Sequence, residues 1–418
     1  MKKNKIFVQI ASYRDPQLLP TLKDMLDKAD KPNNLTIGIC WQHSDEDEWD
    51  KLDDFKDDER FKIIDVNYSE SKGVCWARNA VQALYDEEEY TLQLDSHHRF
   101  VKSWDKKLID MYKKIKKKGY KKPLLTAYIP SFDPDNDPEA RVQEPWKMNF
   151  DRFTPEGIVF FIPAAYDSYD DKSEPLLSRF YSAHFGFTTG KFCKEVKHDP
   201  NYYFHGEEIS IAARAFTHGY DMFHPNEVIV WHEYTRKGRT KQWDDDKDWY
   251  SRNTACHLRN RKLFEMDGEK RDIDFGEYGF GTQRTLRDYE KFAGICFGNR
   301  SITNDVIEKK IPKFDNMKIT DEDFQNSLSR VFKHCIDLQY SQVQEKDYDF
   351  WCVAFRDAED KDIFRKDADI NEINQLWNDP DGYIKLWREF NTTKQPKNWI
   401  VWPHSVSKGW CDPIIGNL

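Results

Sequence analysis

Short apolar runs alternate with amphipathic segments from residue 5 to about residue 130. The apolar runs predict strands, and an apolar residue at every third or fourth position between them predicts helices. The predicted strands are 6–10, 35–41, 62–66, 90–94 and 124–129, and the predicted helices are 18–29, 74–85 and 104–118. Strands joined by crossover helices form mostly parallel sheets covered on both faces. The predicted fold class is therefore α/β, with a Rossmann-like, mostly parallel sheet.

The pattern becomes irregular between residues 130 and 175, where Pro, Asp and Ser are frequent and only the apolar run 157–162 interrupts them. Long irregular segments inside compact domains are usually functional, so we expect a lid or an acceptor-binding loop here. Regular structure resumes with predicted strands at 180–187 and 227–231 and a helix at 209–216.

After residue 265 a charged, loop-rich segment leads to aromatic, β-prone runs, which predict a small domain of the sandwich type. The expected organisation is an α/β domain over 1–265, a connecting segment packed on it over 266–325, and a β-rich accessory domain over 326–418. We interpret the tryptophans of this last region as core packing rather than a sugar-stacking surface. They are Trp351, Trp387, Trp399, Trp402 and Trp410.

Composition narrows the class of protein. Aromatic residues make up 15% of the 418 residues, as expected for a large globular core. The net charge of −10 argues against nucleic acid as the main partner, and the lysines of 106–122 fit the solvated face of an amphipathic helix. No apolar segment approaches transmembrane length, so we expect no membrane partner. Eight scattered cysteines without a CxxC pair favour a reducing, cytoplasmic location.

Asp95-Ser96-His97-His98 directly follow the apolar strand 90–94. This places an acid and two imidazoles at the carboxyl end of a strand, the edge where α/β sheets bind ligands. A carboxylate and an imidazole two residues apart can reach the same divalent cation. Such a cation holds a nucleotide diphosphate and neutralises its charge as it departs.

Two loops flank this motif. The first predicted strand ends in Ala11-Ser12-Tyr13-Arg14-Asp15-Pro16, where a nucleotide base and ribose would lie, although an ordinary turn starting at Asp15-Pro16 explains the same residues. Gly73 precedes helix 74–85, whose N-terminus can receive an anion. Arg78 lies off the buried stripe of that helix. It is either a surface charge or a contact to a diphosphate or ribose.

His232 follows the predicted strand 227–231. A lone histidine is more often structural than a ligand, but at this strand end His232 would supply the ligand that the motif lacks. Asp95, His97 and His232 would form a set of one oxygen and two nitrogen ligands, with open positions for two phosphate oxygens. This mixture suits Mn²⁺, whereas sites made only of oxygen suit Mg²⁺ better.

These motifs resemble those of GT-A fold glycosyltransferases. The Asp-x-His motif with a distal histidine resembles the polypeptide N-acetylgalactosaminyltransferases. A closer resemblance is to family 60, the polypeptide α-N-acetylglucosaminyltransferases, and it covers roughly residues 5 to 300. It is carried by Ala11-Ser12-Tyr13-Arg14-Asp15, Asp95-Ser96-His97-His98-Arg99-Phe100, Gly206-Glu207-Glu208, Trp231-His232-Glu233-Tyr234 and 279–289.

The resemblance implies a role for each matching residue. Asp95, His97 and His232 would bind the metal, with His98 behind them. Residues along the uridine diphosphate and the sugar would be Ser12, Arg14, Gly73, Arg78 and Gly186. Glu207 and Glu208 would be the catalytic residues that face the sugar and the incoming hydroxyl, and Arg236 would neutralise the departing phosphate.

The implied reaction is metal-dependent, retaining transfer of a sugar, with GlcNAc preferred, from a UDP-sugar to a Ser, Thr or hydroxyproline hydroxyl of a polypeptide. GalNAc, glucose or galactose as donor sugar and a glycan as acceptor are alternatives. The family mechanism does not require a carboxylate nucleophile. The sequence leaves open which of the two glutamates acts, what the accessory domain does and which oligomer forms.

Three rival functions fit the residues less well. A nucleotidyltransferase would need a glycine-rich phosphate loop, but residues 10–16 contain no glycine. A metal hydrolase built on His97 and His98 would need more clustered ligands than the dispersed histidines offer. A catalytically inactive module that binds glycans or proteins through its aromatic C-terminal region remains an alternative.

Overall fold

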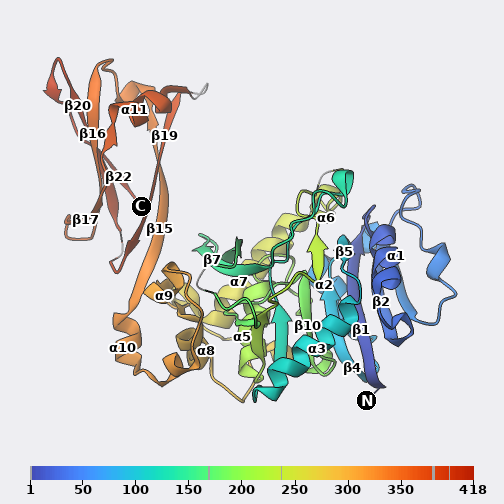
Figure 1. Ribbon diagram of the computed structural model, residues 1–418. Coiled ribbons are helices and arrows are strands. Elements are labelled where there is room, and N and C mark those ends of the chain that lie inside the picture. Colours follow the sequence, from blue (N-terminus) through green and yellow to red (C-terminus); the bar gives the residue numbers. More distant parts are fainter. Residues whose placement is uncertain (1, 168–169, 237, 379–381, 395) are drawn as a thin grey trace. The chain divides into compact units, whose positions relative to one another are not determined.

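The computed structural model describes residues 2–167, 170–236, 238–378, 382–394 and 396–418. The chain divides into two compact units (Figure 1). The first unit comprises Met1–Arg300 with Asp305–Asp321, and the second comprises Ser301–Asn304 with Glu322–Leu418. No helix in the described ranges is both long enough and apolar enough to cross a bilayer.

The first unit contains an eight-stranded sheet in the order β3-β2-β1-β4-β10-β6-β11-β9. Its strands are β1 (Lys2–Tyr13), β2 (Leu35–His43), β3 (Phe61–Asn67), β4 (Glu88–Leu94), β6 (Pro123–Thr126), β9 (Leu176–Leu177), β10 (Phe185–Thr189) and β11 (Asp221–His224). Strands β1 to β4 pair in parallel, as do β6 and β11, while β10 is antiparallel to both of its neighbours. The predicted class, α/β with a mostly parallel sheet, is confirmed.

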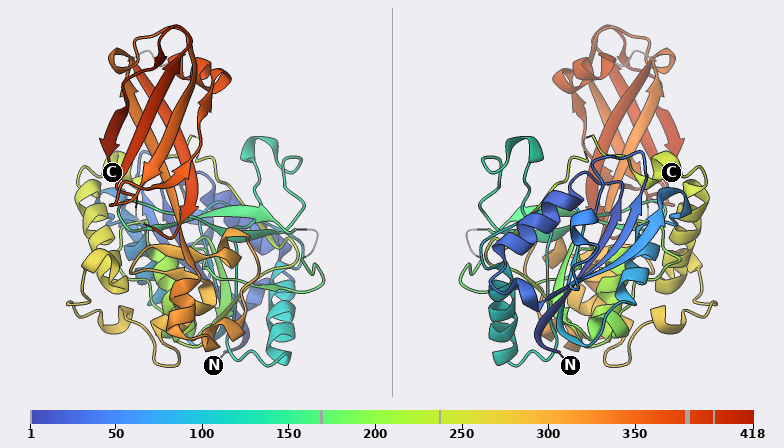
Figure 2. Two further views of the ribbon diagram at one scale, coloured as in Figure 1. Left: turned by 90° about the vertical axis from the view of Figure 1, so that its left-hand side faces the viewer. Right: turned by 90° about the vertical axis from the view of Figure 1, so that its right-hand side faces the viewer.

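Helices cover both faces of this sheet (Figure 2). The helices of the first unit are α1 (Leu18–Lys28), α2 (Val74–Gln82), α3 (Trp104–Lys117), α4 (Phe192–Glu195), α5 (Glu207–Thr217), α6 (Gln242–Asp245), α7 (Trp249–Phe264), α8 (Leu286–Ala293) and α9 (Asn304–Ile307). Because side chains alternate along a strand, neighbouring residues of β1 face different layers. Val8 belongs to the core that includes α1 and α3, whereas Phe7 packs with Val81 of α2. Each such burial contributes about 1.5–3 kcal/mol.

The segment predicted to be an irregular lid contains a regular hairpin. Strands β7 (Trp146–Phe153) and β8 (Val159–Ala165) pair antiparallel across a short turn at 154–158. The apolar run 157–162, which interrupts the irregular pattern, forms much of β8. Pro, Asp and Ser are concentrated on either side of the hairpin, and they hide its strand pattern in the sequence. A lid function for this segment remains a prediction.

Two very short strands matter for the site. They are β5 (His98–Phe100) and β12 (Val230–His232), which pair antiparallel with His232 opposite His98. The remaining strand of the first unit is β13 (Ile295–Cys296). The ladder of β5 and β12 joins two sequence-distant segments beside the carboxyl end of β4.

The second unit contains antiparallel sheets and the helices α10 (Asp321–Asn326) and α11 (Ile370–Gln375). One sheet joins β14 (Ser301–Thr303), β15 (Leu328–Gln339) and β19 (Tyr383–Thr392). The other joins β16 (Tyr348–Arg356), β17 (Asp362–Arg365), β18 (Ala368–Asp369), β20 (Asn398–Ser405), β21 (Gly409–Trp410) and β22 (Ile414–Asn417). Buried and exposed residues alternate along all of β19, as expected for a strand with one face on a core. Figure 2 shows the two layers in orange and red.

The tryptophans of this unit divide into two groups. Trp351 and Trp399 are buried in the core, which confirms the interpretation as packing residues. That interpretation is wrong for Trp387, Trp402 and Trp410, which are 57%, 38% and 49% exposed. Strand alternation explains the difference between Trp351 and Trp402, because they lie on opposite faces of the sheet formed by β16 and β20.

Candidate active site

A cavity of about 380 Å³ lies in the first unit and is lined by most of the predicted site residues. This volume is within the range of small-ligand pockets. Its lining includes Gly73, Arg78, Asp95, His97, Glu207, Glu208, His232 and Arg236. Ser12, Arg14 and Gly186 are placed close by in β1, the loop after it and β10. The carboxyl ends of the parallel strands therefore carry the cavity, as expected for an α/β sheet.

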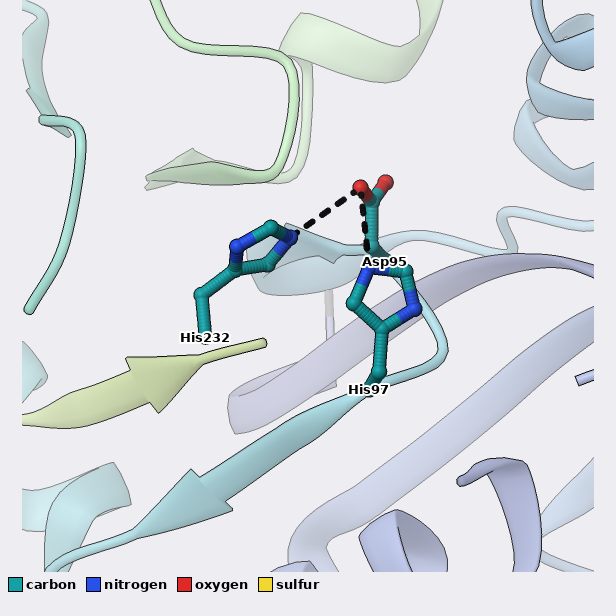
Figure 3. A group of neighbouring side chains, drawn as sticks. All are labelled: Asp95, His97 and His232. Carbon is teal, nitrogen blue, oxygen red and sulfur yellow. Dashed lines mark ion pairs between the residues drawn. The ribbon is translucent and has the colours of Figure 1, made fainter. Parts of the chain in front are cut away.

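Asp95, His97 and His232 converge on one point (Figure 3). Asp95 follows β4, His97 precedes β5, and His232 ends β12. The Nε2 atoms of His97 and His232 lie 3.7 and 3.5 Å from Oδ2 of Asp95, and one ligand atom from each residue falls within 4.8 Å of the others. The structure thus brings together the three residues predicted to bind a metal.

The surroundings of His232 suit a cation. Burial lowers the pKa of His98 and of His232 well below the usual value, so both rings are neutral. Neither ring nitrogen of His232 has a hydrogen-bond partner among the described residues, although both are buried. A buried nitrogen without a partner is costly, and a metal ion in the centre would satisfy Nε2. The donor set therefore fits a divalent cation.

His98 holds the backbone next to the metal motif and does not face the predicted metal position. Its Nδ1 donates to the Trp231 carbonyl at 3.0 Å, and its Nε2 accepts the backbone N–H of Asp95 at 3.2 Å. Both ring nitrogens are thereby used, which leaves none for a metal. The ring instead links β12 to the residue that starts the motif.

Arg78 connects the cluster to Glu207. Its guanidinium bonds Oδ1 of Asp95 at 2.5 Å and also pairs with Glu207. Burial would raise the pKa of Asp95, but Arg78 and the neighbouring histidines outweigh it and hold that pKa well below its usual range. Arg78 is 5% exposed, so the reading as a surface charge is wrong. Its contact with a donor diphosphate remains a prediction.

Glu207 and Glu208 have opposite electrostatic settings although they are adjacent at the start of α5. Glu207 also accepts a hydrogen bond from the Cys75 thiol at 2.9 Å. Burial would raise the pKa of Glu207, but Arg78 and His198 outweigh burial and lower that pKa to about 2. Glu208 accepts the Tyr128 hydroxyl at 2.8 Å and the Ala183 N–H at 2.9 Å. Burial, the largest influence, raises its pKa to about 7. Glu207 is thus a fixed anion, and Glu208 can exchange a proton near neutral pH.

The remaining predicted donor-binding residues occupy different settings. Gly73 has φ +105°, and a Cβ there would lie 2.8 Å from the Tyr203 ring, so glycine is required at the cavity wall. Arg14 pairs with Asp47 and Asp245, while Ser12 is fully buried. A Cβ on Gly186 would lie 2.9 Å from Tyr181, so packing alone accounts for this glycine. The donor contacts of Ser12, Arg14 and Gly186 remain predictions.

Arg236 lines the cavity with its guanidinium 5.4 Å from the Phe204 ring and 5.5 Å from the Trp243 ring. Such stacking holds the cation without neutralising its charge. The position suits the predicted interaction with phosphate, which itself remains a prediction.

Sequence reasoning gave no site role to several polar residues of this cavity, among them Asp15, Tyr128 and Arg239. Burial would raise the pKa of Asp15, but His97, Arg239 and Ser96 outweigh it and hold that pKa below its usual range. Tyr128 follows the carboxyl end of β6, so its strand-end position was a usable signal. Asp15 belongs to the motif 11–15, which predicts either a nucleotide-binding loop or a turn, and neither interpretation gives this carboxylate a role at the metal. Arg239 carries no local signal.

The sequence matches the family model described as "Glycosyltransferase (GlcNAc)" over residues 5–59 and 50–299. A search of curated proteins gave no match. Among solved structures, GalNAc-T7 with UDP, GalNAc and Mn²⁺ is similar at 14% identity and a TM-score of 0.47, covering 62% of this chain and 49% of that one. TarS 1–349 of S. aureus with UDP-GlcNAc is similar at 12% identity and a TM-score of 0.39, covering 77% and 81%.

The chain thus spans about half the length of the GalNAc-T7 chain. The family match covers well over half of this chain and includes every residue that lines the cavity. The resemblance inferred from the motifs is confirmed: the protein belongs to the glycosyltransferase (GlcNAc) family.

Proposed function

We propose that this glycosyltransferase is metal-dependent and transfers GlcNAc from UDP-GlcNAc to a hydroxyl of a polypeptide, with retention of the anomeric configuration. The observation that carries the proposal is the cluster of Asp95, His97 and His232 at the cavity, in which neither His232 nitrogen has a hydrogen-bond partner among the described residues. The family description supports GlcNAc as the sugar. The motif resemblance supports a Ser, Thr or hydroxyproline acceptor.

Asp95, His97 and His232 would hold Mn²⁺, or Mg²⁺ as the second choice, because a set of one oxygen and two nitrogens suits Mn²⁺. The bound ion would supply positive charge to the UDP leaving group. Arg236, which keeps its charge at the cavity wall, would add to this stabilisation. The N-terminus of α2 after Gly73 would receive phosphate oxygens.

The two glutamates would have different tasks. Glu207 is held by Arg78 and remains ionised, so it would orient Arg78 and a sugar hydroxyl. Glu208 shares a hydrogen bond with Tyr128 and exchanges its proton near pH 7, so it would orient the acceptor hydroxyl. No carboxylate nucleophile is needed if leaving group and acceptor share one face of the sugar.

We further propose a cytoplasmic location, which eight free cysteines support. The catalytic residues all belong to the first unit, and the second unit would be an accessory domain.

The test is UDP release by the purified protein with Mn²⁺ and each of UDP-GlcNAc, UDP-GalNAc, UDP-glucose and UDP-galactose. We expect the wild type to hydrolyse UDP-GlcNAc. Asp95→Ala should abolish this hydrolysis, and Asp105→Asn should leave it unchanged. Asp105 is a matched control, because it is buried in α3 and bonds two backbone N–H groups. Peptides with Ser, Thr or hydroxyproline would then be examined for a mass increase of one sugar. No metal-dependent binding of any donor would favour an inactive binding module instead.

A further inference from the structure

A buried carboxylate, Asp15, lies directly behind His97. It follows β1 and is 2% exposed. Its Oδ2 is 2.7 Å from Nδ1 of His97, while Nε2 of the same ring faces Asp95. An ionised carboxylate can only accept, so the hydrogen between the two groups belongs to His97. The ring is therefore held with Nδ1 protonated and with the Nε2 lone pair directed at the predicted metal position.

Asp15 is itself fixed by contacts from other parts of the unit. Ser96 donates its hydroxyl to Oδ2 at 2.6 Å, and the backbone N–H of Gln17 donates to Oδ1 at 2.9 Å. Because both oxygens are engaged, the carboxylate cannot turn away from His97. The local chain around Asp15 and the metal motif are thus linked through one buried group.

Arg239, from the segment after β12, adds a charge to this arrangement. Its guanidinium pairs with Oδ2 of Asp15 at 2.8 Å and contacts Nδ1 of His97. The guanidinium and Nδ1 of His97 thus lie beside the same carboxylate oxygen. One carboxylate therefore sets the positions of both His97 and Arg239.

We propose that Asp15 is a positioning residue of the metal centre, holding His97 in the tautomer and orientation in which Nε2 can bind the cation. This rests on the proposed function, because it requires the cluster to hold a metal. Carboxylates that accept from the far nitrogen of a metal-binding histidine typically contribute about 10–100-fold in metal affinity or activity.

Asp15→Asn tests the proposal, since it retains the volume and one acceptor oxygen. Mn²⁺ affinity would be measured by calorimetry on the full-length protein. We expect the Kd to rise about 10–100-fold, and activity to recover in part at saturating Mn²⁺. Asp105→Asn is the matched control and should leave the Kd unchanged.

A second readout needs no metal. In protein labelled with ¹⁵N-histidine, NMR distinguishes the two neutral tautomers of His97. The wild type should show Nδ1 protonated, and Asp15→Asn should shift the population toward Nε2. If Asp15→Asn is recovered unfolded, Ser96→Ala removes one contact to Oδ2 and should raise the Kd by a smaller factor.

An unchanged Kd together with an unchanged His97 tautomer in Asp15→Asn would overturn the proposal. A wild-type protein that binds no Mn²⁺ would instead contradict the proposed function. In that case the tautomer measurement still decides whether Asp15 orients His97.

Discussion

The cavity edge of the first unit and the core of the second unit bury opposite kinds of side chain. At the cavity edge, Arg78, Asp95 and Glu207 are linked by ion pairs in low-dielectric surroundings. In the second unit, the core consists of apolar side chains such as Trp351, Val353 and Leu386, and the charged residues lie mostly outside it.

This difference in buried side chains distinguishes residues that position a ligand from residues that stabilise the fold. Burying a charged group costs the free energy of its hydration, and an ion pair recovers little more than that cost. The ion pairs of the cavity edge therefore add little net stability. Apolar burial stabilises directly. Changes at the cavity edge should therefore alter activity more than stability, and changes in the sandwich core should do the reverse.

The largest effect is expected for His232→Gln. Because neither ring nitrogen of His232 has a hydrogen-bond partner among the described residues, the change should alter the free energy of unfolding by no more than about 1 kcal/mol. Loss of a metal ligand should lower UDP release by about 10³-fold. Thermal melting would measure the change in stability, and initial rates of UDP release would measure the change in activity. Retention of near wild-type rates would remove His232 from the metal site.

The reverse behaviour is expected for Trp351→Ala in the sandwich core. Truncating this fully buried ring should destabilise the second unit by about 3–5 kcal/mol. UDP release below the unfolding temperature should be unchanged. Trp402→Ala, on the exposed face of the same strand pair, is the matched control and should cost less than about 1 kcal/mol. Equal losses for both variants would contradict the assignment of the two faces.

Glu207→Gln should be an exception at the cavity edge, because it removes a partner of the buried Arg78. Asp95 would still pair with Arg78, but the buried guanidinium would lose one of its two anionic partners, at a cost of about 1–3 kcal/mol, so stability and activity should both fall. Chemical denaturation of Glu207→Gln and Glu208→Gln would give the comparison. The inference fails if Glu208→Gln, which has no direct cationic partner among its hydrogen bonds, is the more destabilised.

A smaller effect is expected for the pH dependence of stability, through Glu208. Native Glu208 keeps its proton up to about pH 7, whereas the unfolded carboxyl loses it near pH 4.5. Between these values the native state binds the extra proton, so the contribution of Glu208 to stability falls as pH rises, by up to about 3 kcal/mol. Glu208→Gln should remove this slope from melting curves taken between pH 5 and 8. Parallel slopes for the two proteins would show that Glu208 does not titrate in this range.

Much of the architecture and of the site could be predicted from local sequence pattern. The periodicity from residue 5 to 130 was sufficient for the α/β class because strand and helix periods differ. The motif Asp95-Ser96-His97-His98 could be placed at a strand end because it directly follows an apolar run. The hairpin of β7 and β8 was missed, since its strands are short and enclosed by turn-forming residues.

By itself, the sequence determined the fold class, the Asp-x-His motif and the order of the family motifs, all of which depend on residues close together in the chain. Only the tertiary structure decided that His232 lies beside Asp95, through the pairing of β5 with β12. It also decided that Asp15 contacts His97, that Glu207 pairs with Arg78, and that Glu208 accepts a hydrogen bond from Tyr128. These relations depend on the burial and pairing of distant segments, which determine each group's charge and partners.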